Sequence, residues 1–238
     1  MVIMDAHVVG PAVGRVLASG AGNVFGPLFA VLARLRPAAK PLHPKGIQFR
    51  GTLYRSGSHF PLGVPWLDES GSDPVLVRLS RSIGLPESLP DIHGLALRIE
   101  RPQGCVDVLF ATTGQGKVSR FLLTPRLSPG GAYSTLMPYR AVTGPIVLLA
   151  FLDGDGGLPK SMHSPNGRPS MTVRLSAAIA TGPWREFGHL QLTGPIHNND
   201  SPVSFDPILH QMSDLPNYQW AHRIRAKAYS SARTARNR

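Results

Sequence analysis

Short apolar runs separated by glycine, proline, aspartate and serine recur along this chain between residues 47 and 193. Runs of this length, rich in β-branched and aliphatic residues, are typical of β-strands. We predict seven or eight strands, of which seven lie over residues 47–55, 75–80, 94–100, 105–112, 146–152, 171–180 and 185–193. About eight antiparallel strands suffice to close a barrel with an interior just wide enough for side chains or a small ligand.

Two of the strand pairs read as hairpins. The run at 94–100 is followed by Arg101-Pro-Gln-Gly104 and a second apolar run, and the runs at 171–180 and 184–192 flank Thr181-Gly182-Pro183. Short loops that contain glycine favour such hairpins. Among the remaining segments, 57–74 and 153–169 are predicted to be loops.

Residues 114–140 look irregular. Within them, the stretch 133–140 is predicted to be a short helix or a crossing segment.

Two helices are expected to flank the strands. In residues 11–36, apolar residues recur at three- and four-residue steps before Pro37, which predicts a helix packed on the barrel wall. A basic amphipathic segment lying on a membrane surface is the alternative for 11–36. Residues 217–238 predict a second, basic helix. The fold class is therefore α+β, an antiparallel β-barrel with flanking helices.

Composition is that of an ordinary folded protein. Of the 238 residues, 42% are hydrophobic and 16% are charged, which is unlike a disordered chain. This length is ordinary for one β-rich domain with a sizeable core. We expect a single domain over 1–238.

The chain is strongly basic, with 25 Lys and Arg against 14 Asp and Glu and a formal net charge of +11. This charge favours anionic partners such as a membrane surface, nucleic acid or carboxylate-bearing ligands. Nucleic acid is disfavoured because the aromatic residues that stack single-stranded bases are not interleaved with the cations. Association of several copies is left open.

Cys105 is the single cysteine, so the chain has no intramolecular disulfide and no Cys-Cys metal site. A reducing, cytoplasmic setting fits this best. The sequence has no apolar run long enough for a spanning helix, and its N-terminus shows no signal-peptide pattern.

Several common catalytic signatures are missing. The chain contains no Gly-x-Ser-x-Gly elbow, no Walker loop and no Gly-x-Gly-x-x-Gly after a strand. Its nine histidines never form His-x-His or His-x-x-x-His, which disfavours a metallohydrolase. Asp91 and His93 would be a weak metal pair, and we interpret them as structural.

The order of three strands resembles that of catalases and their smaller relatives. In that family a Val-Arg-Phe-Ser strand leads to an Asp-x-x-Gly-Phe-Ala-Leu-Lys strand and then to a Gly-x-x-Asp-Leu strand. Here Val77-Arg78-Leu79-Ser80, Asp91 to Arg98 and Gly104 to Val108 follow the same order. The chain is identified as a small member of the catalase-like superfamily, and this resemblance implies haem b as its cofactor.

The resemblance implies a distal side built around His43. Lys40 to Gly46 is similar to the Arg-x-x-His-x-x-Gly segment that precedes the first barrel strand of catalases. His43 would then be the acid/base residue, a role suited to an imidazole near neutral pH. Lys40 stands where an arginine usually meets a haem propionate, and Ser80 matches the serine that orients the distal imidazole. Arg78, in the strand that matches Val-Arg-Phe-Ser, is a further predicted cofactor-binding residue.

The proximal side would lie in the C-terminal helix. Arg225, Tyr229 and Arg236 share roughly one helical face, and catalases carry the same Arg, Tyr, Arg spacing with the tyrosine as iron ligand. A guanidinium beside a phenol favours the phenolate that binds iron(III), and a further arginine can pair with a propionate. Tyr229 is thus the predicted metal ligand.

The sequence departs from the catalase pattern at one place that bears on the reaction. The asparagine pair of catalytically active members falls here on Ala111 and Thr112, and a threonine hydroxyl is shorter than an amide and aimed differently. The resemblance therefore implies a haem peroxidase acting on hydrogen peroxide or an organic hydroperoxide, rather than a rapid dismutase. The alternative is a haem-free catalase-fold protein that binds a small apolar ligand or a protein partner.

Overall fold

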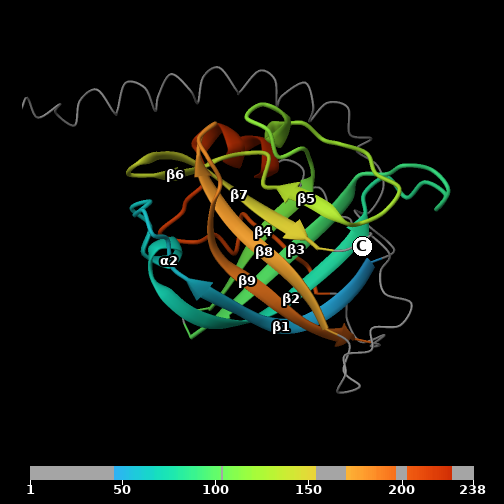
Figure 1. The fold of residues 1–238 in the computed structure, drawn as a ribbon, viewed down its shortest axis with the longest axis horizontal. Helices are drawn as coiled ribbons and strands as arrows, with labels where there is room; N and C mark the ends of the chain where they lie inside the picture. Colours follow the sequence, from blue (N-terminus) through green and yellow to red (C-terminus); the bar gives the residue numbers. More distant parts are fainter. Residues whose placement is uncertain (1–45, 103, 154–169, 197–202, 227–238) are drawn as a thin grey trace, which may run out of the picture.

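A computed structural model describes residues 46–102, 104–153, 170–196 and 203–226. Strands dominate these residues. They are β1 (Gly46–Ser56), β2 (Ser70–Arg81), β3 (His93–Arg101), β4 (Gly104–Thr112), β5 (Gly131–Ser134), β6 (Tyr139–Ala141), β7 (Gly144–Leu152), β8 (Ser170–Ile179) and β9 (Arg185–Pro195) (Figure 1). The seven strand ranges predicted from the apolar runs are confirmed as β1–β4 and β7–β9.

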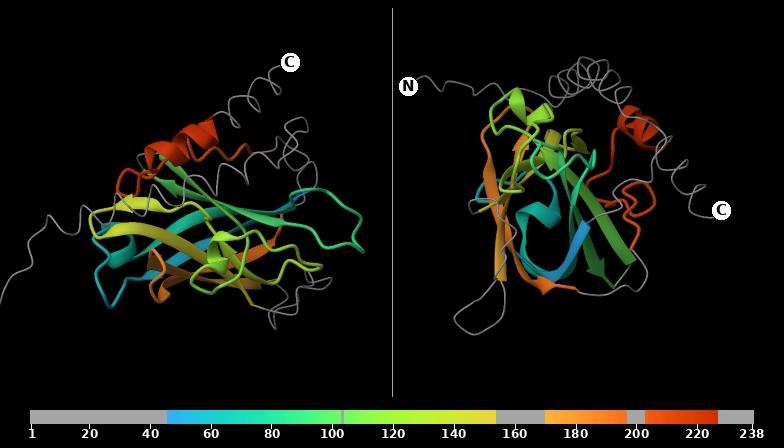
Figure 2. Two further views of the ribbon diagram at one scale, coloured as in Figure 1. Left: turned by 90° about the horizontal axis from the view of Figure 1, so that it is seen from above. Right: turned by 90° about the vertical axis from the view of Figure 1, so that its right-hand side faces the viewer.

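The strands form one antiparallel sheet in the order β5-β4-β3-β2-β1-β9-β8-β7-β6, and β5 also pairs with β7. This additional pairing joins the two halves of the sheet, so β1–β5 and β7–β9 form a closed ring of eight strands, with β6 beside β7. Figure 2 shows the sheet curling round on itself. The predicted antiparallel barrel is therefore confirmed.

Alternation along each strand separates an inner from an outer face. On β3, Leu95, Leu97 and Ile99 belong to the main hydrophobic core, and Ala96 and Arg98 between them do not. The same two-residue period runs through the other strands of the ring. The barrel interior is thus an apolar core, and polar side chains of the strand centres lie outside it.

A short helix, α2 (Pro65–Asp68), closes one end of the barrel (Figure 1). Trp66 and Leu67 enter the main core from it. The Asp68 carboxylate accepts the backbone N–H groups of Leu62, at 2.7 Å, and Val64, at 3.0 Å. These bonds fix the turn before the helix.

The prediction of a loop over 57–74 was wrong at both its centre and its end. Besides α2, this region holds the first residues of β2, which pair with the end of β1. Arg55 explains the extension, because it donates to Asp73 at 2.9 Å and to the carbonyls of Trp66 and Glu69. A strand end stabilised by polar cross-strand bonds carries no apolar run that a sequence pattern could reveal.

The short helix, one of the two interpretations of residues 133–140, was also wrong. Two short strands occupy this stretch, and β5 is the eighth strand of the ring. Tyr133 pairs with Ala150 and Ser134 with Leu149, so β7 supplies the partner. Leu136, with φ of 58°, then turns the chain, and its N–H is accepted by the Ser134 hydroxyl. Runs this short have no detectable period.

Residues 203–226 run along the outside of the barrel. Their last part, from 219 to 226, is helical and lies within the range predicted for the C-terminal helix. In Figure 2 this helix lies outside the ring of strands. Trp220 and Ile224 pack with Leu136 and Met137 around the buried Phe121 and Val147. Residues 227–238 and the expected helix at 11–36 lie outside the described residues.

The loop between β2 and β3 is organised by one buried carboxylate. Asp91 accepts the backbone N–H groups of Ile83, Gly84 and Leu85 at 2.9 to 3.1 Å. Arg81 lies 3.4 Å from the same carboxylate. Burial alone would raise the pKa of Asp91, but these backbone hydrogen bonds outweigh burial and lower it. The interpretation of Asp91 as structural fits this arrangement.

No helix among the described residues is long and apolar enough to cross a membrane.

Replacing Asp91 by Asn is expected to destabilise the protein by about 3 kcal/mol, because a buried carboxylate that accepts several N–H groups and faces an arginine is lost. The pKa of Asp91 is lower in the folded chain than in the unfolded chain. Its stabilisation is therefore complete above the unfolded pKa of about 3.9 and is lost as the pH falls through the lower folded value. Urea unfolding across this acid range measures both effects.

Glu87→Gln is the matched control, since Glu87 is exposed in the same loop and its replacement should change stability by less than about 0.5 kcal/mol. Equal stability of Asp91→Asn and wild type at neutral pH would contradict the role given to Asp91.

Candidate functional site

Arg78 and Ser80 project from the outer face of the barrel. On β2, Val75, Val77 and Leu79 belong to the main core, so the alternate positions 78 and 80 face outward. Both are half-buried rather than exposed. These two residues were predicted for the distal side from the resemblance, and the structure places them on one face of one strand.

A row of small residues crosses the barrel at the level of Ser80. Gly46 on β1 pairs with Ser80, Ser80 with Gly94, Gly94 with Ala111, and Ala111 with Ser134 on β5. Register partners share a face, so all of them point outward. Side chains no larger than a hydroxymethyl group therefore occupy this level on five adjacent strands, and the one on β5, Ser134, is fully buried and donates to the Arg120 carbonyl. We call this row and the neighbouring Arg78 the shelf.

The Arg78 guanidinium occupies space that a side chain at position 46 would fill. A Cβ atom added to Gly46 would lie 2.7 Å from Cζ and Nη2 of Arg78. Burial lowers the pKa of the Arg78 guanidinium, yet arginine remains protonated in proteins. The shelf thus carries a half-buried positive charge at its edge, and its position depends on the absence of a side chain at Gly46.

The next row of outward residues adds apolar surface. In register with Arg78 lie Gln48 on β1 and Ala96 on β3, and Ala96 pairs with Leu109 on β4. Gly94 above Ala96 is closely packed, because an added Cβ would lie 3.3 Å from the Ser80 hydroxyl. Small, partly apolar side chains beside a cation suit a ligand with a negatively charged edge.

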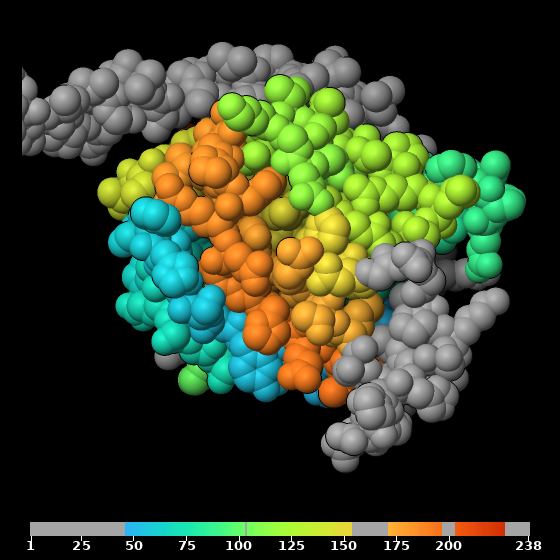
Figure 3. All heavy atoms as spheres, in the orientation of Figure 1, coloured from blue at the N-terminus to red at the C-terminus, as the bar shows by residue number. Residues whose placement is uncertain are grey.

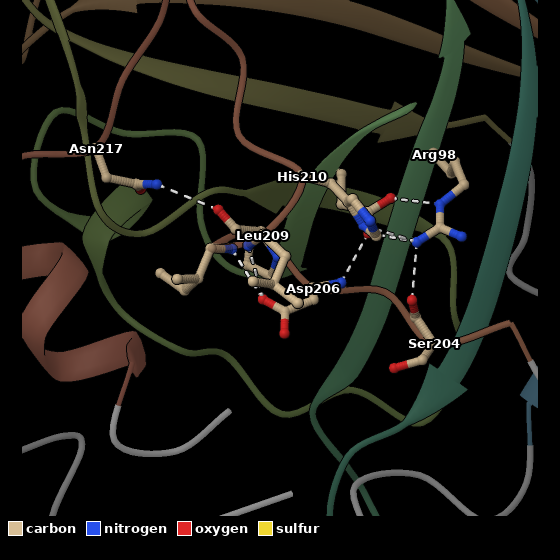
Figure 4. Close-up of polar contacts among 9 residues, drawn as sticks. Arg98, Ser204, Asp206, Leu209, His210 and Asn217 are labelled. Atoms are coloured by element: carbon tan, nitrogen blue, oxygen red, sulfur yellow. Dashed lines mark hydrogen bonds and ion pairs between the residues drawn. The ribbon is translucent and has the colours of Figure 1, made fainter. Parts of the chain in front are cut away.

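A buried ion pair below the shelf holds the C-terminal segment against the same outer face (Figure 4). Arg98 on β3 donates to both carboxylate oxygens of Asp107 on β4, at 2.7 and 2.6 Å. Hydrogen bonding to Asp107 raises the pKa of Arg98. Arg98 also donates to the Ser204 carbonyl at 2.8 Å, and its guanidinium lies over the Phe205 ring.

Asp107 accepts two further donors from the C-terminal segment. The backbone N–H of Asp206 donates to Asp107 Oδ2 at 2.7 Å, and His210 Nδ1 lies 2.8 Å from the same oxygen. His210 Nδ1 is also 3.1 Å from the Arg98 guanidinium. Since a carboxylate only accepts, we assign the Nδ1 proton to the bond with Asp107. Residues 204–210 are thereby fixed below the shelf.

Three solved structures share this architecture. A fungal catalase is 15% identical over 88% of this chain and 61% of its own, with a TM-score of 0.56. A bacterial catalase is 14% identical over 90% and 60%, with a TM-score of 0.54, and catalase A from Saccharomyces cerevisiae is 13% identical over 88% and 63%, with a TM-score of 0.54. The chain has the catalase-like fold.

The chain spans less than two thirds of the length of each of these catalases. No protein-family model and no curated protein sequence matches it. At such low identity the likeness establishes the fold alone.

Thr112, predicted to be catalytic, does not share the shelf. It pairs with the core residue Tyr133, so it faces the inside of the catalase-like barrel. It is fully buried, and its hydroxyl accepts the backbone N–H of His93 at 3.2 Å. Of Ala111 and Thr112, the two positions matched to the asparagine pair of catalases, Ala111 is the one that faces the shelf. An amide would therefore reach the shelf from position 111 rather than from position 112.

Arg225, predicted for the proximal side, is buried at the end of the described helix. It donates to the Asn217 side chain at 2.9 Å and to the Thr135 carbonyl at 3.4 Å, and its guanidinium lies 5.9 Å from the centre of the Tyr139 ring. These bonds join the helix to the catalase-like barrel.

The remaining predicted site residues, Lys40, His43, Tyr229 and Arg236, lie outside the described residues, so their roles stay predictions. His43 precedes the shelf residue Gly46 by three positions. Sequence reasoning missed the small row itself. The hairpin predicted for residues 94–112 contained a signal for it, because pairing Glu100 with Cys105 across that loop sets Gly94 opposite Ala111.

Within the described residues, no three His, Cys, Asp or Glu side chains are grouped as a metal site would require. His93 Nε2 donates a hydrogen bond to the Arg126 carbonyl at 3.0 Å, and burial lowers the pKa of His93. A neutral His93 must donate this bond, because a carbonyl only accepts. His93 therefore has a structural partner, as interpreted from the sequence.

Thr112→Val is expected to destabilise the protein by about 1 to 3 kcal/mol, since it removes the acceptor of a buried backbone N–H while keeping the side-chain volume. Thr112→Ser retains the acceptor and should lose less. Urea unfolding of the two variants distinguishes them. If valine and serine gave the same stability, the bond from His93 would not be the reason for a threonine here.

Proposed function

We propose that this chain binds haem b against the shelf and acts as a peroxidase on hydrogen peroxide or an organic hydroperoxide. The observation that supports this most directly is the row of small residues from Gly46 to Ala111, with the Arg78 guanidinium at its edge. Three solved proteins with the same fold are named catalases. The small side chains and the cation of the shelf would serve one face of such a cofactor.

The residues present fit the group. Haem is a planar macrocycle with two carboxylates, so it needs a flat apolar surface and cations near one edge. Gly94, Ala96 and Ala111 provide small side chains on adjacent strands, and Leu109 adds apolar contact. Arg78 would pair with a propionate, since a guanidinium matches carboxylate geometry. Lys40 and Arg236 are the further cations proposed for the propionates.

When bound, the iron would supply the chemistry that cleaves the O–O bond of a peroxide. The proposed work of the protein is proton transfer and orientation. His43 would take a proton from the peroxide and return it to the departing oxygen. Ser80 would hold the imidazole by a hydrogen bond, and the phenolate of Tyr229, favoured by Arg225, would be the proximal ligand.

We propose peroxidase rather than rapid dismutase chemistry because the shelf carries no amide at the position facing it. Ala111 faces the shelf, and the Thr112 hydroxyl is occupied inside the barrel by the His93 N–H. A cytoplasmic location, suggested by the single Cys105, is part of the proposal.

A haem-free binding protein is the second candidate, and Arg225 favours it. Both terminal nitrogens of its guanidinium donate to protein oxygens, those of Asn217 and Thr135. This arrangement gives Arg225 a structural purpose that requires no iron ligand. In that case the shelf would hold a small apolar ligand or a protein partner.

Gly94→Leu is expected to weaken hemin binding by more than about tenfold, equivalent to about 1.4 kcal/mol. The isobutyl group would stand on the shelf, where even a methyl group meets the Ser80 hydroxyl. Absorption titration of the purified protein with hemin measures the affinity. Gln191→Leu is the matched control, because Gln191 is exposed on the outer face of β9, away from the shelf.

Haem bound equally well by Gly94→Leu and by the control would reject the shelf as the haem site. Wild-type protein that takes up no hemin would favour the second candidate.

Tyr229→Phe is expected to alter the haem spectrum and to lower hemin affinity, because it removes the phenolate and keeps the ring. Tyr218→Phe is the control. Tyr218 lies directly before the same helix, and its ring stacks with that of Trp220, the two ring centroids being 6.4 Å apart. It should leave the spectrum unchanged. Were Tyr229 a surface residue, its replacement would change stability by less than about 0.5 kcal/mol and leave hemin binding intact.

A further inference from the structure

We infer that one end of the barrel is a docking surface for anionic lipid membranes. The surface consists of aliphatic side chains on the β2–β3 and β4–β5 loops, and we call it the apolar rim. Ile83, Leu85 and Leu89 are 60%, 37% and 47% exposed, and Leu127 is 62% exposed. Scattered single exposed aliphatics are ordinary, whereas several on adjoining loops mark an interaction surface.

The two loops are joined by a backbone bridge. The N–H of Asp91 donates to the Arg126 carbonyl, and the N–H of Arg126 donates to the Asp91 carbonyl, both at 2.9 Å. Leu89 and Leu127 therefore stand close to the same bridge. Figure 3 shows the atoms of the β2–β3 loop projecting at one edge of the molecule beside those of the β4–β5 loop. The rim is thus built on two adjoining loops.

The rim is held rigidly from behind. Arg81 donates to the carbonyls of Pro86, at 3.1 Å, and Leu89, at 2.9 Å. Arg126 donates to the carbonyls of Thr113 and Gly130, each at 2.7 Å. Together with the bonds to Asp91, these satisfy many of the loop's backbone groups internally. Such loops can enter an apolar phase at a low cost in ordering and desolvation.

Shape and charge favour a lipid surface as the occupant. Separate aliphatic tips on a projecting loop suit a fluid apolar layer, which adapts to them, better than they suit a preformed protein groove. The chain has a formal net charge of +11, and Lys117 of the β4–β5 loop is exposed. Glu87 is the exposed acidic residue on the β2–β3 loop. Because the net charge of the chain is positive, anionic headgroups would attract the protein, and burial of the rim in the lipid would then hold it there.

This inference does not depend on haem. The β2–β3 loop of the rim begins directly after the strand that carries the shelf residue Ser80 and ends before Gly94, so a chain docked through it would hold the shelf near the lipid. The membrane contact predicted for residues 11–36 involves a different part of the chain and is a separate expectation.

Vesicle co-sedimentation of the full chain tests the inference. The probes are vesicles of phosphatidylcholine alone and of phosphatidylcholine mixed with phosphatidylglycerol. We expect binding to the mixed vesicles, and we expect Ile83→Ser with Leu89→Ser to lower the partition coefficient by about tenfold or more. The matched control is Val142→Ser with Leu209→Ser, because these residues are 96% and 64% exposed away from the rim. The control should bind like wild type.

Thermal unfolding of both double variants verifies that each is folded before binding is compared. Equal binding by the rim variant and the control would overturn the inference, since charge alone would then account for attachment. Absence of vesicle binding by wild type would also overturn it. If, in addition, wild type formed a concentration-dependent dimer that the rim variant lost, the rim would be a contact between copies of the chain.

Discussion

The pairing of β5 with β7 is the interaction on which the rest of the structure depends. Without it the strands would form an open sheet, and with it they form a ring whose interior is apolar. The joint is short, running from Gly131 to Ser134 opposite Leu149 to Leu152. Because closure commits the inner face to packing, polar side chains from the strand centres, Arg78 and Ser80 among them, are left for the outside.

A second constraint acts from outside the ring. The Asp107 carboxylate is buried, and removal of its partners would leave a costly unpaired charge. Arg98, His210 and the Asp206 N–H supply those partners from the neighbouring strand and from the C-terminal segment. The segment is therefore fixed one row below Ala96 and Leu109. Helical residues 219–226 then lie beside the end of the shelf formed by Ser134, through the bond from Arg225 to Thr135.

Much of the barrel could be predicted from the apolar runs, because strands of eight or more residues carry a readable period. The missed parts share a physical cause. β5 and β6 are too short to show a period, and the early start of β2 rests on the ion pair of Arg55 with Asp73. Such elements owe their form to partners distant in sequence, which no local pattern records.

For the candidate site, sequence reasoning found residues with distinctive chemistry and missed those with none. Arg78 and Ser80 were recognisable from the resemblance, and the structure places both on the outer face. Thr112 was aligned by counting along β4, and counting cannot tell which of two neighbours faces outward without the core assignment. Gly46, Gly94 and Ala111 contribute by being small, a property visible only once the strands are in register.

Gly46 has a consequence for how such proteins diverge. The Arg78 guanidinium lies where a side chain at position 46 would be. The choice of residue at one position therefore limits the choice at the other, although the two are distant in the chain. Among relatives with this barrel, a side chain at position 46 and an arginine oriented in this way at position 78 should exclude each other. Relatives that lack the arginine at position 78 can then carry a larger residue at position 46. Covariation of the two positions would show which relatives have lost the shelf.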